Sequence, residues 1–573
     1  MQEPELSKYR KGKTKYIVIT GSVMSGVGKG TFSGCLAALL ACHGLNISPL
    51  KFDGYLNYDA GTLNPYRHGE VFVLDDGTEC DLDLGSYERF LHKDLSKDNY
   101  LTAGKIFKSI IEKERKGKFL GRDVQFIPHV TGEIKAFVRK LALKTNADIV
   151  LIEVGGTVGD IENSYFIEAM RELRHEEGKE NVCFINVTYI IQSHALSEQK
   201  SKAAQLGLRT LMGLGIQPDI VVCRSEFPID EKIREKISIY SNLPLNRIYN
   251  LYNLDIYEIP LMLRKLGIDK EIFKILNIRG KRHKFIVNFK RWENFATRIR
   301  NAKKEITIAI VGKYTYVKDS YLSIVKALEH ASAYYSVKIN IKWIEATDVE
   351  DKIAKIKARR GSIKDVDNFL REMLRGVDGI IVPGGFGKRG IEGKIALIRY
   401  AREKGLPFLG LCLGLQLAVI EFARNVCGIK DANTTEIASC ANPVIDIIPE
   451  QEENLNSGNL GGTMRLGSFP ARLKPGTLVA RLYGRLLVNE RHRHRWEVNP
   501  KYVKVLERHG MIIAGIYEKR NLVEFIELSR HRFFVATQAH AEFKSRPFSP
   551  HPLFLGLVKA CLERNLERKN EIG

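Results

Sequence analysis

Short runs of β-branched and other apolar residues, each followed by a helical pattern, recur along the first half of the chain. "KYIVIT" precedes "GTFSGCLAALLACHG", and "ADIVLIEV", "VTYIIQ" and "DIVVCR" follow later. Continuous apolar runs of this length are typical of strands buried on both faces of a parallel sheet, with helices as the connections. The sequence therefore predicts a doubly wound α/β domain.

The second half repeats this alternation after a strongly basic stretch. "EITIAIVGKY", "INIKWIEA", "GIIVPGG" and "PFLGLCLG" have the composition of strands, and "SYLSIVKALEHASAYY" has that of an amphipathic helix. A chain of 573 residues also exceeds what one hydrophobic core usually serves. We expect an α/β domain over residues 1–278, a basic linker over residues 279–304 and a second doubly wound α/β domain over residues 305–573.

Composition narrows the class of protein. With 44% hydrophobic and 27% charged residues, the chain is typical of a soluble globular protein. The net charge of +22 is compatible with a polyanionic partner. However, the basic residues lie in scattered runs such as "KARR" and "RGKRHK", which are typical of solvated helix faces, and no nucleic-acid module is recognisable. We expect no nucleic-acid partner.

Cysteine usage and hydropathy indicate the compartment. The nine cysteines form no CxxC pair, which argues against a disulfide framework or a zinc site. "MQEPELSKYRKGK" lacks the apolar core of an export signal, and no later segment offers about 18 uninterrupted apolar residues for a membrane span. We expect a cytoplasmic protein with no membrane partner.

The stretch "YIVITGSVMSGVGKGTF" predicts a phosphate-binding loop between a strand and a helix. Successive N–H groups of such a turn face an anion at a helix N-terminus, and Lys29 adds a positive charge. The spacing is longer than usual between Gly21 and Gly28, and Gly30 replaces the usual hydroxyl residue. An ordinary strand-to-helix turn is the alternative.

Carboxylates near this loop could replace the missing hydroxyl as magnesium ligands. In "DDGTECDLDLG", Asp81 and Asp83 point to one side if the segment is extended, and Glu153 closes the strand "ADIVLIEV". A solvated acidic loop is the alternative. "EVGGTVGDIE" adds Asp160 and Glu162.

"SEQKSKAAQ" places Lys200 and Lys202 two residues apart, with Gln205 close behind. Two lysines at this spacing suit a triphosphate, and a surface charge pair explains them equally well.

Residues 410–414 read Gly-Leu-Cys-Leu-Gly, a version of the sharp strand-to-helix elbow that exposes a nucleophile. The helix N-terminus stabilises a Cys412 thiolate, and nearby N–H groups, including those of "VPGGFG", can form an oxyanion hole. In "FFVATQAHAEF", His540 and Glu542 are two apart after an apolar strand, so we expect them to meet as base and orienting group. The alternative is a core cysteine and an unrelated surface histidine.

Several long motifs resemble one enzyme family. "TGSVMSGVGKG", "NPYRHGEVFVLDDGTECDLDLGSYERFL", "EVGGTVGDIE", "GIQPDIVVCRS", "PGGFGKRGIEGK", "GLCLGLQLAV", "GGTMRLG" and "ERHRHRWEVNP" are similar to CTP synthases, and the similarity spans residues 15–560. The second domain resembles a class I glutamine amidotransferase.

The resemblance implies a carbon–nitrogen ligase of pyrimidine biosynthesis with a P-loop-like N-terminal synthetase domain and a C-terminal glutaminase domain. Glutamine hydrolysis through a cysteinyl thioester would supply ammonia for the ATP-dependent amination of UTP to CTP through a 4-phosphorylated UTP. Mg²⁺ would be required, GTP would activate and CTP would inhibit. Family members assemble as homotetramers, and filaments are possible.

The resemblance also assigns residues to sites. Cys412 would be the nucleophile, His540 the general acid/base and Glu542 its orienting carboxylate. Glutamine would bind at Gly385, Leu413, Gly414, Leu415, Gln416, Glu436 and Arg495. ATP would bind at Gly26, Val27, Gly28, Lys29, Gly30, Thr31, Lys51, Asp83, Tyr252, Asn253 and Leu254, and the metal at Asp83 and Glu153. UTP and CTP would bind at Ser25, Asp160, Ile161, Glu162, Lys200, Ser201, Lys202, Ala203, Ala204, Gln205 and Lys236.

Some positions depart from the family pattern. "KSKAAQ" replaces Lys-Thr-Lys-Pro-Thr-Gln, so Ala203 and Ala204 lose a rigid proline and a hydroxyl, and weaker UTP and CTP binding is expected. Asn163, Gly132, Glu133 and Ala541 also differ. A divergent paralogue that assembles into tetramers or filaments with weak or no synthetase activity is the alternative function.

Overall fold

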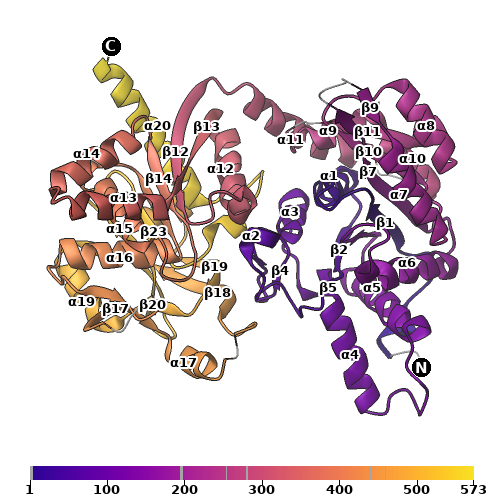
Figure 1. The fold of residues 1–573 in the computed structure, drawn as a ribbon, viewed down its shortest axis with the longest axis horizontal. Coiled ribbons are helices and arrows are strands. Elements are labelled where there is room, and N and C mark those ends of the chain that lie inside the picture. Colours follow the sequence, from indigo (N-terminus) through magenta and orange to yellow (C-terminus); the bar gives the residue numbers. More distant parts are fainter. Residues whose placement is uncertain are drawn as a thin grey trace. The chain divides into compact units, whose positions relative to one another are not determined.

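The computed structural model describes residues 4–193, 198–252, 255–278, 282–437, 440–458 and 460–572. The chain forms two compact units (Figure 1). Unit 1 comprises Met1–Ala60 and Asp83–Ala296, and unit 2 comprises Gly61–Leu82 and Thr297–Gly573. Each unit is described by itself.

Unit 1 is built on a seven-stranded parallel sheet of order β11-β10-β7-β1-β6-β2-β5. Central β1 pairs in parallel with both neighbours, so that Ile17 lies opposite Leu151 and Cys183. The order reverses beside β1, as the doubly wound prediction requires. The strands are β1 (Lys15–Gly21), β2 (Ile47–Asp53), β5 (Tyr100–Thr102), β6 (Ile149–Val154), β7 (Val182–Tyr189), β10 (Ile220–Ser225) and β11 (Ile248–Tyr252).

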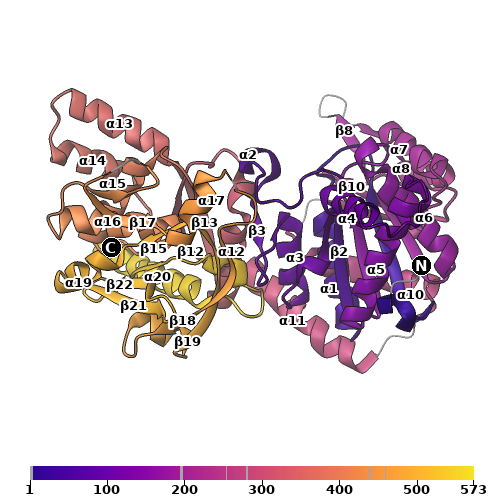
Figure 2. The same cartoon turned by 90° about the horizontal axis from the view of Figure 1, so that it is seen from below.

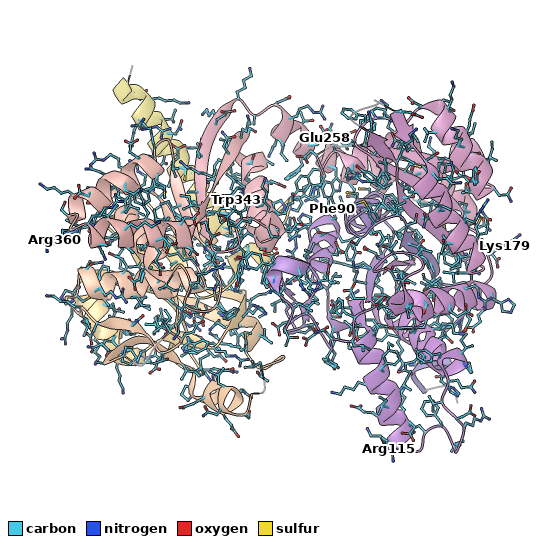
Figure 3. The ribbon with its side chains drawn as sticks, in the orientation of Figure 1. Phe90, Arg115, Lys179, Glu258, Trp343 and Arg360 are labelled. Atoms are coloured by element: carbon cyan, nitrogen blue, oxygen red, sulfur yellow. The ribbon has the colours of Figure 1, made fainter. Side chains whose placement is uncertain are left out.

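Helices connect and cover these strands. Figures 1 and 2 show α5 beside α6. The ring of Phe90 in α3 stacks on Trp292 in α11 with centroids 5.5 Å apart (Figure 3 labels Phe90). The helices include α1 (Lys29–Cys42), α3 (Leu82–Leu91), α4 (Ala103–Arg115), α5 (Thr131–Thr145), α6 (Ser164–Glu177), α7 (Lys202–Gly213), α8 (Glu231–Ser241), α9 (Ile259–Leu266), α10 (Ile268–Ile275) and α11 (Arg282–Arg300).

The stretch predicted as a basic linker is mostly helix. Residues 282–300 form α11, whose Trp292 and Phe295 are buried although many of its neighbours are basic. The boundary between the units falls inside this helix, at Ala296 and Thr297.

Unit 2 is built on a nine-stranded sheet of order β13-β12-β14-β15-β23-β22-β21-β18-β19. The first five strands are parallel, and from β23 onward the neighbours are antiparallel, an extension that the sequence patterns did not indicate. The strands are β12 (Lys304–Gly312), β13 (Val337–Glu345), β14 (Gly379–Val382), β15 (Phe408–Leu411), β18 (Arg465–Leu473), β19 (Leu487–His494), β21 (Met511–Tyr517), β22 (Leu522–Leu528) and β23 (Phe534–Thr537).

Helices pack on both faces of the unit 2 sheet, which confirms the second doubly wound domain. One core gathers Val382 and Leu413 with the helices α13 (Ala346–Ala358), α14 (Ile363–Met373), α15 (Ile391–Lys404) and α16 (Leu413–Asn425). The other gathers Ile310 and Leu409 with α12 (Leu322–Tyr335) and α20 (Pro552–Ile572). Figure 2 shows the two helical layers.

A short segment from the N-terminal half belongs to unit 2. Gly61–Leu82, which lies inside the stretch predicted as the first domain, carries α2 (Pro65–His68) and the small hairpin β3 (Phe72–Val73) and β4 (Glu79–Cys80). Asp75 pairs with Arg491 and, at 2.7 Å, with Lys544, while Glu79 pairs with Arg493 at 2.7 Å. Charge pairing therefore holds this segment within unit 2.

In the part of the chain that the structure describes, the helices lack the combination of length and apolar composition needed to cross a bilayer.

Candidate active sites

Cys412 lies at the bend between β15 and α16, as the elbow prediction requires. Its φ of 50° and ψ of −102° are unusual for a residue with a side chain. Glycines on either side allow the close packing of the turn, because a Cβ at Gly414 would lie 2.2 Å from the Val382 carbonyl oxygen. A Cβ at Gly410 would lie 2.8 Å from the Gly414 backbone. The bend therefore presents the thiol at the carboxyl end of the sheet.

His540 and Glu542 meet as predicted, although not through strand alternation. β23 ends at Thr537, and Glu542 lies in the 3₁₀ helix Ala541–Lys544, whose turn brings its Oε1 to 2.7 Å from His540 Nδ1. The imidazole also stacks on Phe543 with ring centroids 5.0 Å apart. The hydrogen bond to Glu542 and the stacking on Phe543 thus fix the orientation of the ring.

The imidazole and the thiol side chain flank the same glycine. A Cβ at Gly384 would lie 3.3 Å from His540 Nε2 and 3.5 Å from Cys412 Cβ. Burial by itself lowers the pKa of His540, but Glu542 and Cys412 outweigh it and raise that pKa to about 10. The geometry therefore favours an imidazolium beside the sulfur, which stabilises a thiolate.

Gly385 lies in the loop that follows β14, close to Lys313 and Leu413. Two residues later the Gly387 N–H donates to Glu436 Oε1 at 2.6 Å. Burial raises the pKa of Glu436, against the lowering effects of this N–H and of Lys313 and Lys394. A half-buried carboxylate beside this loop is a suitable partner for a substrate ammonium group.

The other residues assigned to glutamine lie close by in the fold. Leu413–Gln416 form the first turn of α16, and the Gln416 side chain donates to the Trp496 carbonyl at 2.8 Å. The Arg495 guanidinium donates to the Leu460 carbonyl and to Thr463 Oγ1, each at 2.9 Å, and also to Gln451.

A cavity of about 240 Å³ in unit 2 opens onto the thiol site. Its walls include His540 and Glu542, the loop at Gly384–Phe386, and residues 61–63 and 65 of the N-terminal segment. Sequence reasoning missed this contribution, because nothing in the local pattern of residues 61–82 indicates which domain the segment joins.

In unit 1, the glycine-rich turn between β1 and α1 has the form of a phosphate loop. Gly26 and Gly28 have φ of 72° and 91°, and Lys29 begins α1. The Lys29 ammonium donates to the Gly156 carbonyl at 2.6 Å, and burial lowers its pKa. Ser25, Val27 and Thr31 complete the predicted loop. Arg224 of β10 reaches the same turn, since a Cβ at Gly28 would lie 3.3 Å from its Nε.

Asp83 occupies the space that the usual hydroxyl residue would need. A Cβ at Gly30 would lie 1.8 Å from Asp83 Oδ1, so glycine at position 30 is what allows the carboxylate to reach the phosphate loop. The prediction of an extended segment was wrong here, because Asp83 lies in the first turn of α3. Asp81 precedes the helix.

Asp83 and Glu153 converge on one cation. Lys51 Nζ lies 2.9 Å from Glu153 Oε1 and also pairs with Asp83. Burial raises the pKa of Glu153, and Lys51 opposes this effect. Tyr87, which sequence reasoning missed, donates to the second Glu153 oxygen. Two carboxylates beside a phosphate loop fit the oxygen-ligand preference of Mg²⁺.

The predicted pyrimidine residues come from elements that meet near the end of β1. Gly159, beside Asp160, approaches Thr210 of α7, and Gly207 of α7 packs against Ser22. The Asp160 carboxylate accepts from the Thr157 N–H at 2.7 Å, and Ile161 is exposed. Glu162 follows in the 3₁₀ helix Ile161–Asn163.

The predicted pyrimidine-binding residues also include the lysines Lys200, Lys202 and Lys236. Lys200 pairs with Glu198 at 2.6 Å, and Lys236 of α8 acts on the same carboxylate. Lys202 begins α7, and Gln205 donates to Ser201 Oγ at 2.8 Å. Tyr252 ends β11. Asn253 and Leu254 lie outside the described residues.

The departures from the family pattern have structural roles. Asn163 is buried and donates to the Gly155 and Thr157 carbonyls at 3.0 and 2.9 Å, so it fixes the loop that carries Asp160. Ala204 is buried among Leu208 and Val221, whereas Ala203 is only partly buried.

The other departures are Glu133, Gly132 and Ala541, and Ala541 lies between His540 and Glu542. Glu133 accepts from Lys113 at 2.7 Å, and Ala541 is buried. A Cβ at Gly132 would meet no atom within 4 Å.

Comparisons with known proteins agree with this architecture. The family described as "CTP synthase N-terminus" matches residues 15–278, and "Glutamine amidotransferase class-I" matches residues 316–560. The chain is 50% identical over 554 residues to a CTP synthase of Thermococcus gammatolerans, covering 96% of this chain and 99% of the relative. It is 49% identical over 558 residues to a CTP synthase of Pyrococcus abyssi, covering 97% and 99%. A solved Trypanosoma brucei CTPS glutaminase domain with bound acivicin is 33% identical with a TM-score of 0.40, over 45% of this chain and 94% of that one.

Proposed function

The chain belongs to the CTP synthase family, and from that premise we propose that Cys412, His540 and Glu542 hydrolyse glutamine while the phosphate loop of unit 1 activates UTP. Members of this family use glutamine to aminate UTP to CTP, with ATP, UTP and glutamine as substrates. One observation supports the residue assignments above all. The strained elbow at Cys412 lies beside the pair His540 and Glu542, whose Nδ1 and Oε1 atoms are 2.7 Å apart.

Glutaminase chemistry begins with a thiolate and an imidazolium. The Cys412 sulfur attacks the amide carbon, and N–H groups of the 383–387 loop and of the α16 N-terminus stabilise the oxyanion. His540 gives its proton to the departing nitrogen, so the C–N bond breaks, ammonia leaves and a thioester forms. Neutral His540 then takes a proton from water, the hydroxide attacks the thioester, and the thiolate departs as glutamate forms.

The residues around Cys412 would hold glutamine. Glu436 supplies a carboxylate for the substrate ammonium group, and Arg495 supplies a guanidinium for its carboxylate. Gly385 offers an N–H, and Leu413–Gln416 offer the first turn of a helix.

Synthetase chemistry requires phosphoryl transfer to UTP. The O4 atom of UTP attacks the γ-phosphorus of ATP, and the bond to ADP breaks. Ammonia then attacks C4, and the C4–O bond breaks to release phosphate. Gly26–Thr31 would cradle the ATP phosphates, and Lys51 would act as a fixed cation. Tyr252–Leu254 would lie near adenine.

Asp83 and Glu153 would hold Mg²⁺, because their carboxylates converge beside the phosphate loop and Gly30 leaves room for Asp83. Bound there, the ion would neutralise charge that develops on the transferred phosphoryl group. Lys51 would then share the two carboxylates with the metal.

The pyrimidine nucleotide would bind beside Ser25, Asp160–Glu162, Lys200–Gln205 and Lys236. The proximity of Lys200 and Lys236 to Glu198 supports a site for a polyphosphate, whose charge would compete with that carboxylate. We assign CTP inhibition to these same residues. We also propose that GTP activates the enzyme, that the protein assembles as homotetramers or filaments, and that it is cytoplasmic. Synthetase residues would lie in 1–60 and 83–278, and glutaminase residues in 305–573 and in the 61–82 segment.

The decisive experiment measures CTP formation from UTP, ATP and Mg²⁺ with glutamine plus GTP or with ammonium chloride. We expect turnover with both nitrogen sources. Cys412→Ala should lose at least about 1,000-fold of the glutamine-dependent rate and retain the ammonia-dependent rate, because only the first needs the nucleophile. A Cys412→Ala protein that still uses glutamine would contradict the assignment.

The same assay distinguishes CTP synthesis from the alternative function. A folded protein that hydrolyses glutamine but makes no CTP from either nitrogen source would instead support a paralogue that assembles without synthesis.

A further inference from the structure

Gln538 lies two residues before His540, and its side chain reaches the Cys412 thiol. It follows β23 by one residue, is completely buried, and its Nε2 lies 3.8 Å from Cys412 Sγ. The backbone places Gln538 and Cys412 side by side, because the Cys412 N–H donates to the Thr537 carbonyl at 2.8 Å. An amide N–H therefore faces the sulfur at the end of two paired strands.

A further polar neighbour of the sulfur, besides His540, favours the thiol. The Arg493 carbonyl oxygen lies 3.8 Å from Sγ and can only accept a hydrogen bond. It stabilises S–H and repels a sulfur that has lost its proton. An N–H donor acts in the opposite sense, because hydrogen bonding to the charged form favours it.

The amide of Gln538 has a fixed orientation. Its Oε1 lies 3.5 Å from Gln416 Nε2, and that same Nε2 donates to the Trp496 carbonyl at 2.8 Å. Since a carbonyl can only accept, Gln416 must present its NH₂ group there, and Gln538 must turn its oxygen toward Gln416. The NH₂ of Gln538 is thereby directed at the sulfur.

A buried chain of side chains holds the Trp496 carbonyl in turn. His494 Nδ1 lies 3.1 Å from that oxygen and therefore carries the proton, so its Nε2 accepts from His492 Nδ1 at 3.0 Å. His492 Nε2 then faces Glu524 Oε2 at 3.4 Å. Burial lowers the pKa of both histidines, which favours the neutral imidazoles that this chain requires. Each orientation in the chain is determined by its neighbour.

We propose that Gln538 is a further catalytic residue, whose side-chain amide donates a hydrogen bond to the Cys412 sulfur and stabilises the thiolate that attacks glutamine. Gln416 is the positioning residue that orients this amide. The inference rests on the proposed role of Cys412 as nucleophile. Gln538 would be a second group, besides His540, that stabilises the thiolate.

The test compares Gln538→Met, which keeps the length of the side chain but removes the donor, with Gln538→Glu, which places an acceptor against the sulfur. Two rates are measured in the full-length protein: alkylation of Cys412 by iodoacetamide between pH 6 and 9, and glutamate release from glutamine. We expect Gln538→Met to lower kcat for glutamine hydrolysis about tenfold with little change in KM, and Gln538→Glu to lower it further. Alkylation should reach its plateau at higher pH in both variants.

Controls separate this effect from general damage. Asn565→Leu removes another buried amide, in α20, and should leave both rates unchanged. Ammonia-dependent CTP formation should persist in every variant that folds. If Gln538→Met unfolds the protein, the conclusion is drawn from Gln538→Glu, which is polar and has the same length.

The outcomes distinguish a failure of the Gln538 proposal from a failure of the Cys412 assignment. If Cys412→Ala abolishes glutamine use but both Gln538 variants keep the parent alkylation profile and kcat, the role of Gln538 is refuted and the nucleophile stands. If Cys412→Ala still hydrolyses glutamine, the proposed nucleophile itself is refuted.

Discussion

Lys394 carries an ammonium group that the protein encloses completely. Its side chain is 0% exposed, and within the described residues Nζ has no hydrogen-bond partner. Lys313, Glu345 and Glu436 are the charged groups that act on it, and burial is the largest cause that lowers its pKa to about 7. At this position a charge is costly, because desolvation is only partly offset.

Replacing Lys394 by Met should therefore stabilise the protein in a pH-dependent way. Between about pH 7 and 10.5 the unfolded chain holds a proton that folded Lys394 lacks, so the parent gains stability as pH rises through this window. We expect Lys394→Met to raise the free energy of unfolding by about 2 kcal/mol or more at pH 6.5 and by little near pH 10. Urea denaturation at the two pH values measures this, and a gain that is equal at both would contradict it.

At the scale of the element, both sites are built on a strand, a glycine turn and a helix. In unit 1 the turn between β1 and α1 has exchanged a hydroxyl for the carboxylate of Asp83, which Gly30 admits. In unit 2 the turn between β15 and α16 holds Cys412 at positive φ. Gly30, Gly410 and Gly414 are required by close contacts, whereas Gly26 and Gly28 are required by their positive φ.

Restoring the usual side chain in the phosphate loop should damage synthesis. Gly30→Ser would drive Asp83 out of place, since even a Cβ would lie 1.8 Å from its Oδ1. We expect ammonia-dependent CTP formation to fall at least about tenfold, because small displacements of positioned groups are costly, while glutamine hydrolysis is retained. Gly132→Ser in α5, where a Cβ meets no atom within 4 Å, is the matched control. Equal losses in both variants would exclude the Asp83 explanation.

Elements with a clear local pattern could be predicted from the sequence. The elbow at Cys412 and the loop before Lys29 follow from glycine spacing and apolar runs, and both are found. Asp83 could not be placed correctly, because the helix that carries it begins within a polar stretch. The antiparallel strands β18, β19 and β21 depend on long-range pairing that no local pattern encodes.

At the scale of the whole molecule, unit 2 is assembled from two distant parts of the chain. Gly61–Leu82 lies within it, although 83–296 belongs to unit 1. Asp75 contributes to this assembly through Arg491, which is completely buried, and through Lys544. Burial by itself raises the pKa of Asp75, but these two cations outweigh it and lower that pKa.

Asp75→Ala should loosen the segment from unit 2. Removing one partner of a partly buried pair should lower the free energy of unfolding by about 2 kcal/mol at pH 7. The pKa of Asp75 is lower in the folded protein than in the unfolded chain. Its carboxylate therefore stabilises the protein fully at pH values above the unfolded pKa, and this stabilisation is lost as pH falls through the folded pKa. The stabilities of parent and variant should converge in acid. Calorimetric Tm values at pH 7 and pH 3 measure this. Asp351→Ala, at an exposed position in α13, is the control, and a difference that is as large at pH 3 as at pH 7 would contradict the role of this carboxylate.

The divided construction of unit 2 also sets an order for its biosynthesis. Gly61–Leu82 leaves the ribosome long before Arg491 and Lys544, and at roughly 5 to 20 residues per second the delay is on the order of 20 s or more. The segment gains its first unit 2 partners, such as Lys313 and Ser323, only partway through that interval, while the strands of unit 1 on both sides of it can pair earlier. The nascent chain must therefore hold Gly61–Leu82 out as a loop, and the glutaminase cavity acquires its last wall only when translation is nearly complete.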